Sequence, residues 1–171
     1  MSAEQKLYDE LKSLGITFEQ VDHPAVFTTL DSSQIEKNIA GAATKNLFLK
    51  DADGHFALVT VPAEKRVDLG QLRRMTGAKR YSFGSADEME EILRVTPGSV
   101  TPLAAMNDSN DRVQVVIDEI LTAQPRVNVH PLRNTATISL SGLALVQLLV
   151  RWRHAPLVIP VPSKAAGPEP Q

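Results

Sequence analysis

The chain has 171 residues, of which 43% are hydrophobic and 22% charged, and its formal net charge is −2. This size and composition fit one domain with a full hydrophobic core, and the small net charge gives no global attraction to nucleic acid. The absence of cysteine excludes disulfides, thiolate zinc sites and cysteine nucleophiles. No apolar run is long enough to cross a bilayer and the start lacks a secretory-signal pattern, so we expect a soluble cytoplasmic protein with no membrane contact.

The first elements along the chain are two helices separated by a strand. Leucines at helical spacing predict a helix over 7–14, which Gly15 ends. A strand over 16–21 follows, and serines at 32 and 33 indicate the start of a short helix that stops near Gly41.

The clearest supersecondary unit is a β-hairpin. Residues 44–50 (TKNLFLK) form one predicted strand and residues 55–61 its partner, since the intervening Asp-Ala-Asp-Gly is turn chemistry. After it, Asp68 is a candidate cap for a helix ended by Gly77.

The second half of the chain begins with a helix over 86–93, whose start matches a capping box formed by Ser85 and Glu88. Adjacent Pro97 and Gly98 predict a loop. The remaining predicted elements are strands over 113–117, 126–129 and 135–140 and a helix over 141–153.

These elements predict an α/β fold consisting of a single domain over residues 1–155. Strands and helices alternate without a strict βαβ rhythm, so we expect a mixed, partly curled sheet surrounded by helices. The proline-rich stretch 156–171 (PLVIPVPSKAAGPEPQ) is predicted to be a flexible tail.

A local run of basic residues stands out against the mildly acidic whole. Six fall within sixteen residues, and such a cluster can dock a phosphate backbone, although a solvated helix face is the alternative interpretation. The candidate phosphate-binding residues are Lys65, Arg66, Arg73, Arg74, Lys79 and Arg80.

Common catalytic motifs are absent: the sequence has no G-x-S-x-G, H-E-x-x-H, P-loop or G-x-G-x-x-G pattern. The four histidines are isolated from one another, so no local ligand pair starts a metal site, and no metal or cofactor is expected. From composition and motifs alone, this is an α/β domain of unknown purpose.

Three segments, in order, carry a resemblance to a known family. They are 44–50 (TKNLFLK), the Gly-x-x-x-Pro loop 98–102 (GSVTP), and 127–137 (VNVHPLRNTAT). Together they resemble the YbaK/prolyl-tRNA synthetase-associated domain family of aminoacyl-tRNA deacylases, over about residues 3–153. The His-Pro-Leu-x-Asn-Thr-Ala-Thr string is similar to the free-standing alanyl-tRNA(Pro) deacylase branch.

The resemblance implies a catalytic role for Lys45, at the mouth of a pocket. There its ammonium would meet a phosphate or another oxygen of the terminal adenosine, whereas the alternative is a solvated lysine at a strand end. Asn46 faces the other way along a strand, so it either contacts a different part of the substrate or braces the loop.

The loop 98–102 matches the family's substrate loop. Gly98 is assigned a catalytic role, because glycine lets the backbone approach a ligand closely. The substrate-binding candidates that follow it are Ser99, Val100, Thr101 and Pro102. An ordinary connecting turn is the alternative.

Two histidines are further site candidates. His130 ends a strand and is assigned to shaping the pocket or ordering water, with general base and structural hydrogen bonding as the other interpretations. His23 matches a substrate-binding position, and a simple turn role is equally compatible with the sequence.

The predicted function is trans-editing: hydrolysis of alanine mischarged onto tRNA(Pro), without metal or covalent intermediate. The expected partner is the acceptor end of tRNA(Pro), for which the basic residues within 65–80 are the candidate tRNA-binding residues. Prolyl-tRNA synthetase is a further candidate partner, and DNA is not expected. The alternatives are deacylation of another amino acid, such as cysteine on tRNA(Pro), and a non-catalytic tRNA- or synthetase-binding module.

Overall fold

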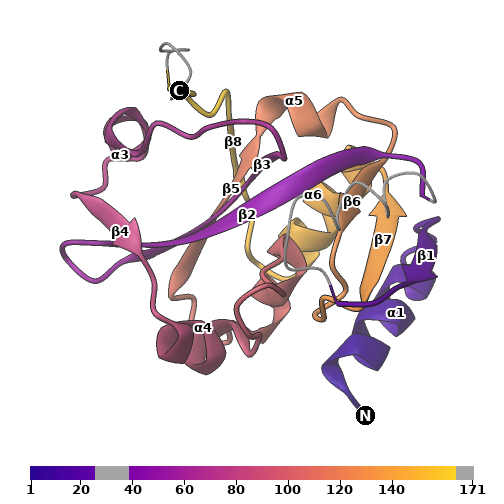
Figure 1. The fold of residues 1–171 in the computed structure, drawn as a ribbon. Helices are drawn as coiled ribbons and strands as arrows, with labels where there is room; N and C mark the ends of the chain where they lie inside the picture. Colours follow the sequence, from indigo (N-terminus) through magenta and orange to yellow (C-terminus); the bar gives the residue numbers. More distant parts are fainter. Residues whose placement is uncertain (26–38, 165–171) are drawn as a thin grey trace.

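The computed structural model describes residues 1–25 and 39–164 (Figure 1). The helix predicted to start near Ser32 lies outside the described residues. Within the part of the chain that the structure describes, no helix has the length and apolar character that a membrane crossing requires.

Fourteen elements follow one another along these residues. In chain order they are α1 (Ala3–Ser13), β1 (Glu19–Asp22), β2 (Ala42–Asp51), β3 (Phe56–Pro62), α3 (Leu69–Thr76), β4 (Tyr81–Phe83), α4 (Ala86–Leu93), the 3₁₀ helix η1 (Pro102–Asn107), β5 (Val113–Asp118), α5 (Glu119–Thr122), β6 (Val127–Val129), β7 (Ala136–Leu140), α6 (Gly142–Arg151) and β8 (Leu157–Ile159).

The strands form one eight-stranded mixed sheet, which confirms the predicted fold class. The order is β1-β7-β6-β2-β3-β5-β8, with β4 added beside β2. The predicted hairpin is the antiparallel pair β2–β3, and β2 also pairs in parallel with β6. The long strand β2 therefore joins the two halves of the sheet, and it crosses the front of the molecule in Figure 1.

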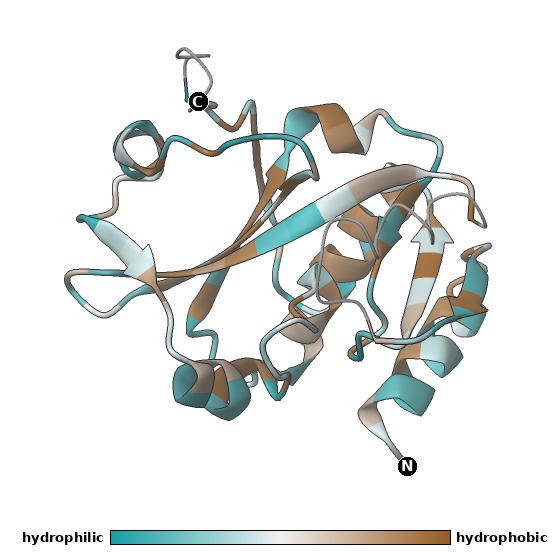
Figure 2. Ribbon diagram, viewed as in Figure 1, coloured by the Kyte–Doolittle hydropathy of each residue, from teal (hydrophilic) through white to brown (hydrophobic). Residues whose placement is uncertain are grey.

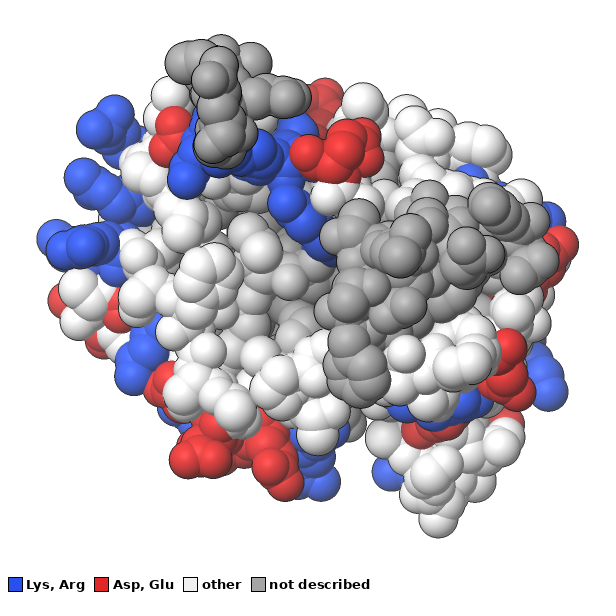
Figure 3. Space-filling view, in the orientation of Figure 1, with Lys and Arg blue, Asp and Glu red and all other residues white. Residues whose placement is uncertain are grey.

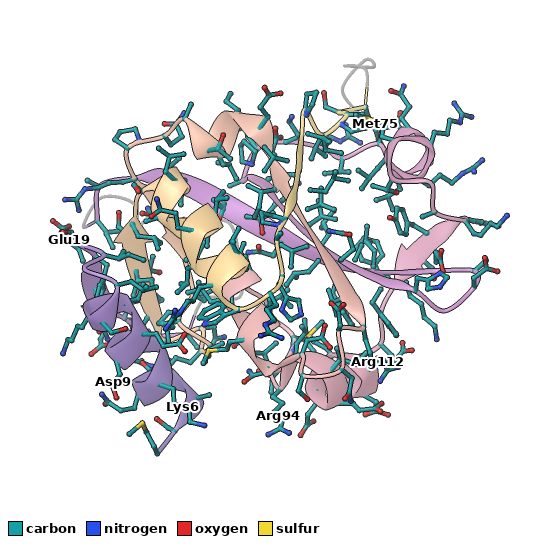
Figure 4. The ribbon with its side chains drawn as sticks, turned by 180° about the vertical axis from the view of Figure 1, so that it is seen from behind. Lys6, Asp9, Glu19, Met75, Arg94 and Arg112 are labelled. Atoms are coloured by element: carbon teal, nitrogen blue, oxygen red, sulfur yellow. The ribbon has the colours of Figure 1, made fainter. Side chains whose placement is uncertain are left out.

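Three apolar clusters fill the space between the sheet and its helices. The largest lies beneath α1 and α6 against β5, β6 and β7; the second is covered by α4 and the third by α3. Figure 2 shows apolar residues concentrated on the strands and α6, but a hydrophilic stretch interrupts the middle of β2. Figure 4, seen from behind, shows α6 in front of the sheet with α1 beside it.

The predicted capping box at the start of α4 is confirmed at atomic detail, whereas the first helix begins at Ala3, earlier than predicted. Ser85 Oγ accepts the Glu88 amide at 3.0 Å, and Glu88 Oε1 accepts the Ser85 amide at 3.0 Å, which completes the capping box. Glu88 also pairs with Lys50 Nζ at 2.6 Å. The hydrogen bond from Lys50, followed by the Ser85 amide, lowers the pKa of Glu88 to about 2. This pair fixes the end of β2 to α4.

The prediction of a flexible tail from residue 156 is wrong for residues 157–164. Leu157–Ile159 is strand β8 and pairs in parallel with β5, and Val161 is buried. The Asp68 amide donates to the Pro162 carbonyl at 2.8 Å, and the Lys164 amide donates to the Arg66 carbonyl at 2.8 Å. Prolines are compatible with this position because β8 is the edge strand of the sheet.

Candidate functional site

The centre of the candidate site is an open stretch of backbone on β2. One edge of the strand pairs with β3 throughout residues 44–50. On the other edge, β6 pairs with residues 42 and 43 and β4 pairs with residues 49–51. Among the described residues no strand pairs with this edge between them. The alternation of an antiparallel ladder turns the backbone of Ala43 and Asp51, and hence that of Lys45 and Leu47, toward β3. The backbone amide and carbonyl of Asn46 therefore face the open edge, where no strand of the described residues pairs with them.

Lys45 lies on this open stretch. The prediction placed it at the start of a strand, but β2 begins at Ala42, so Lys45 is inside the strand and opposite Val61 of β3. Its side chain is half-buried, and no carboxylate of the described residues forms an ion pair with it. Burial, and then the nearby charge of Arg66, lower the pKa of Lys45, while Glu64 opposes the shift. A partly desolvated ammonium of this kind favours an anionic ligand.

Asn46 braces the sheet. Its Oδ1 accepts a 2.6 Å hydrogen bond from Thr60 Oγ1, directly across the β2–β3 pair, and Thr60 is fully buried. The sequence analysis expected a contact with the substrate or with a loop, and the observed contact is instead within the sheet.

The loop 98–102 has one exposed residue and several buried ones. Gly98 is exposed with φ +91°, a left-handed conformation that favours glycine, and a Cβ there would lie 3.5 Å from Asn134 Nδ2. Ser99 is buried, and Thr101 caps η1 by accepting the Leu103 amide at 3.3 Å. Thr101 and Pro102 therefore serve the fold.

Val100 is the loop residue that faces the apolar interior. It packs, partly buried, against the cluster beneath α4, and Leu132 from the loop after β6 packs against the same cluster. The resemblance-carrying segments 98–102 and 127–137 are therefore neighbours in space.

His23 and His130 come together from distant parts of the sequence, with ring centroids 6.4 Å apart. His130 Nδ1 lies 2.9 Å from the Ala136 carbonyl. A carbonyl only accepts, so Nδ1 carries the proton and Nε2 of the neutral ring is an acceptor. Burial lowers the pKa of His130, against the opposing effect of the Ala136 hydrogen bond, which favours this neutral form.

His23 is fixed from both sides of its ring. Nε2 lies 2.9 Å from Thr137 Oγ1 and Nδ1 lies 2.8 Å from the Pro24 carbonyl. Its amide donates to the Thr135 carbonyl at 2.9 Å. The end of β1 is thereby attached to the loop that carries His130.

Arg133, which the sequence analysis did not select, organises this loop. Its Nε donates to Glu4 of α1 at 3.0 Å, NH2 donates to Asp22 at 2.8 Å, and NH1 donates to the Thr135 hydroxyl at 2.8 Å. The hydrogen bond to Asp22, and then the one to Glu4, raise the pKa of Arg133 against the opposing effect of burial. Nothing in the sequence pairs Arg133 with Glu4, so only the fold reveals the contact.

The predicted tRNA-binding residues divide into two groups. Lys65 is engaged within the protein, since its Nζ lies 2.6 Å from the buried Asp118 carboxylate and donates to the Val161 carbonyl at 2.8 Å. The others are Arg66, Arg73, Arg74, Lys79 and Arg80, of which all but the half-buried Arg73 are exposed. Figure 3 shows Lys and Arg gathered at the α3 and β4 side of the molecule, with a further band that reaches the hollowed middle of this face.

Within the ranges 1–25 and 39–164, two clusters contain enough ligand atoms for a metal ion. One is Asp51, Asp53 and His55, and the other is Asp108, Asp111 and His154. In both, the buried aspartate already accepts backbone amides, from His55 for Asp51 and from Val113 for Asp108. Neither cluster contains a residue of the candidate site.

Comparison with known proteins assigns the class. Residues 23–148 match the aminoacyl-tRNA editing domain, a span that includes β2, the loop 98–102 and the histidine pair. The protein therefore belongs to the family of aminoacyl-tRNA editing domains, the class to which YbaK and ProX belong.

Among the members of this family, the chain is similar to proteins whose names refer to prolyl-tRNA editing or to prolyl-tRNA synthetase. The chain is 35% identical over 143 residues to the prolyl-tRNA editing protein ProX of Acetoanaerobium sticklandii, covering 82% of this chain and 87% of that protein. It is 34% identical over 157 residues to prolyl-tRNA synthetase associated domain-containing protein 1 of Danio rerio, covering 91% and 85%. A solved structure of a candidate trans-editing enzyme for prolyl-tRNA synthetase shares the fold, with a TM-score of 0.72 at 20% identity over 96% of this chain and 99% of that one.

Proposed function

We propose that the protein is a trans-editing deacylase that hydrolyses alanine mischarged onto tRNA(Pro). One observation carries the proposal: a half-buried ammonium without an ion-pair partner among the described residues, Lys45, lies on an open strand edge in a family of editing domains. The names of the relatives, which refer to prolyl-tRNA editing and to prolyl-tRNA synthetase, support the choice of tRNA(Pro).

The proposed chemistry needs few catalytic groups. An aminoacyl ester is already activated, so its hydrolysis depends on an oriented water and a stabilised oxyanion. Lys45 would hold a phosphate or ribose oxygen of the terminal adenosine, and the exposed backbone at Gly98 would approach the aminoacyl group. The acceptor Nε2 of His130 suits a hydrogen bond from the water or from a ribose hydroxyl.

Selectivity is proposed to come from the size of the pocket. A synthetase site for proline discriminates poorly against a smaller amino acid, because a methylene contributes only about 1–3 kcal/mol to binding. A second pocket too small for proline completes a double sieve. Val100 and Leu132, which are half-buried beside Gly98 and His130, are the candidate walls.

The acceptor stem is proposed to dock on the basic side of the molecule that Figure 3 shows. Arg74, Lys79 and Arg80 are exposed there, whereas Lys65 is excluded from this role by its internal ion pair. A complex with prolyl-tRNA synthetase and a cytoplasmic location are part of the same proposal.

The test is a deacylation assay with alanyl-, cysteinyl- and prolyl-tRNA(Pro), with and without EDTA. We expect release of alanine, sparing of proline and no effect of EDTA. Preferential release of cysteine would assign the protein to a different substrate, and binding of all three tRNAs without release would identify a non-catalytic module. Equal hydrolysis of alanyl- and prolyl-tRNA(Pro) would contradict the size sieve.

A further inference from the structure

Phe83, at the end of β4, is an aromatic residue that belongs to none of the three core clusters. It is 65% exposed, whereas the neighbouring aromatic of the same strand, Tyr81, packs against the cluster beneath α3. Among the described residues it is the only aromatic side chain left exposed. A single exposed hydrophobic side chain is common on protein surfaces, so the case for a ligand at Phe83 depends on the groups around it.

The backbone that carries Phe83 is fixed. Phe83 pairs with Leu49 of β2, and the next amide, that of Gly84, donates to the Phe48 carbonyl at 2.9 Å. A Cβ at Gly84 would lie 2.4 Å from the Phe48 ring, so Gly84 lies directly on that ring. The Phe83 side chain is therefore presented from a rigid strand end, which lowers the entropy lost on binding.

Register places Phe83 on the same face of the sheet as Lys45. Residues paired across antiparallel strands share a face, as do alternate residues along a strand, so Phe83, Leu49 and Lys45 point the same way. The separation from Leu49 to Lys45 is four residues, roughly 13 Å along the strand. Stacked nucleotides rise about 3.4 Å each, so a run of about four has the length to reach from Lys45 to Phe83. Leu49 itself is fully buried in the cluster beneath α3, so Lys45 and Phe83 would be the contacts at the two ends of the run.

Charge indicates a polyanion on this path. Exposed Lys79 and Arg80 immediately precede β4, and exposed Arg74 lies on α3. Figure 3 shows Lys and Arg side chains gathered on this side, whereas acidic side chains gather over α4. An exposed aromatic ring beside cationic side chains is the combination with which proteins bind single-stranded nucleic acid, because bases stack on the ring while phosphates meet the cations.

We infer that Phe83 is a stacking platform for an unpaired base of the tRNA 3′ end, upstream of the terminal nucleotide at Lys45. This inference rests on the proposed function for its ligand, and adds a subsite that holds the single-stranded end between the basic side and the open edge of β2. Its contribution is affinity and placement of the ester, since Phe83 is separated from the reacting atoms by the length of that run.

The test measures binding of uncharged tRNA(Pro), so that it does not depend on catalysis. Phe83→Ala is compared with wild type on the intact transcript and on one that lacks the unpaired 3′ nucleotides. We expect affinity for the intact tRNA to fall roughly 5- to 150-fold, with the salt dependence unchanged, and affinity for the shortened tRNA to stay the same. Phe83→Tyr keeps the ring and should bind within about twofold of wild type.

The matched control is Leu143→Ala, because Leu143 of α6 is 64% exposed. It should leave both affinities unchanged. An equal loss on both transcripts would overturn the stacking inference, because Phe83 would then act on the duplex or on the charges. Unchanged affinity for both transcripts would also overturn the inference, and contact with a protein would then be the remaining role for the ring. Failure of wild type to release alanine would contradict the proposed function alone, since this binding comparison requires no hydrolysis.

Discussion

The loop that carries His130 differs from the basic side, formed by α3 and the residues before β4, in whether its polar side chains have partners within the protein. In and around the loop the polar side chains have partners: His23 bonds to Thr137, and His130 to Ala136. Arg133 bonds to Thr135 in its own loop and to two other segments, at Glu4 and Asp22. On the basic side, Arg74, Lys79 and Arg80 are exposed and form no ion pair with a described residue. Fixed geometry suits chemistry on an ester, whereas mobile cations suit contact with a phosphate backbone.

Lys45 combines a property of each region. Its backbone is held by the β2–β3 ladder, yet its ammonium has no ion-pair partner among the described residues. The strand fixes the position of the ammonium, and because no counter-charge neutralises it, the ammonium can attract an anionic ligand to that position. The following substitutions test whether the three regions have separate roles.

The largest effect is expected for Lys45→Ala. If its ammonium holds the terminal adenosine, single-turnover deacylation should fall about 10- to 100-fold for every amino acid that is accepted, with little change in preference. Lys45→Arg should restore activity only partly, because a planar fork replaces a compact charge. The melting temperature should shift by only a few degrees.

The control for this substitution is Lys12→Ala, which removes an exposed lysine on α1. It should leave the rate unchanged. Wild-type rates in folded Lys45→Ala would show that Lys45 is not part of the site.

An intermediate effect is expected for His130. Protonation of Nε2 abolishes its acceptor role, so activity should fall as the pH drops below the pKa of the ring. Because burial lowers that pKa, the fall should occur below the ordinary value of about 6.5, and the rate should be level above it once the spontaneous hydrolysis is subtracted. His130→Gln should lower the rate about 10-fold or more and remove this acid limb.

The control is His55→Gln, since the His55 ring lies exposed in the β2–β3 turn. Its pH–rate profile should match that of wild type. An acid limb that persists in His130→Gln would assign the titration to another group, such as His23.

The smallest effect on chemistry is expected for Arg73→Glu with Arg74→Glu. If these residues dock the acceptor stem, tRNA binding should weaken and the slope of log K against log salt should flatten by about two, because fewer counterions are released. The rate at saturating substrate should change little. Lys6→Glu with Lys12→Glu makes the same charge change on α1, where Figure 4 shows Lys6 from behind, and should leave the salt slope unchanged.

The sequence predicted those elements whose signals are local. The capping box at Ser85, the hairpin turn after β2 and the glycine end of α3 each depend on a few adjacent residues, and all three are confirmed. The three-residue strand β4 and the 3₁₀ helix η1 were missed, because elements this short carry too little periodicity. Strand β8 was missed because prolines obscured an edge strand.

The site was predictable in its members but not in its assembly. The motif-bearing segments supplied His23 and His130, which the structure brings together, and Gly98, which lies beside Asn134. The bond between Arg133 and Glu4 spans most of the chain, and no spacing rule connects such residues. Likewise, Lys65 was grouped with the basic run because it is close to it in sequence. Nothing in the sequence indicated the ion pair between Lys65 and Asp118.

Strand β2 limits which insertions and deletions the chain can tolerate. Its first residues pair with β6, its middle is open and its last residues pair with β4, while β3 follows its other edge. One residue added between Ala43 and Leu49 would turn every later side chain to the opposite face. Lys45 would exchange faces with its neighbour, or the apolar residues that follow would leave their clusters. Insertions and deletions should therefore be confined to the turns outside this strand. The ten residues of β2 set the distance between the two halves of the sheet.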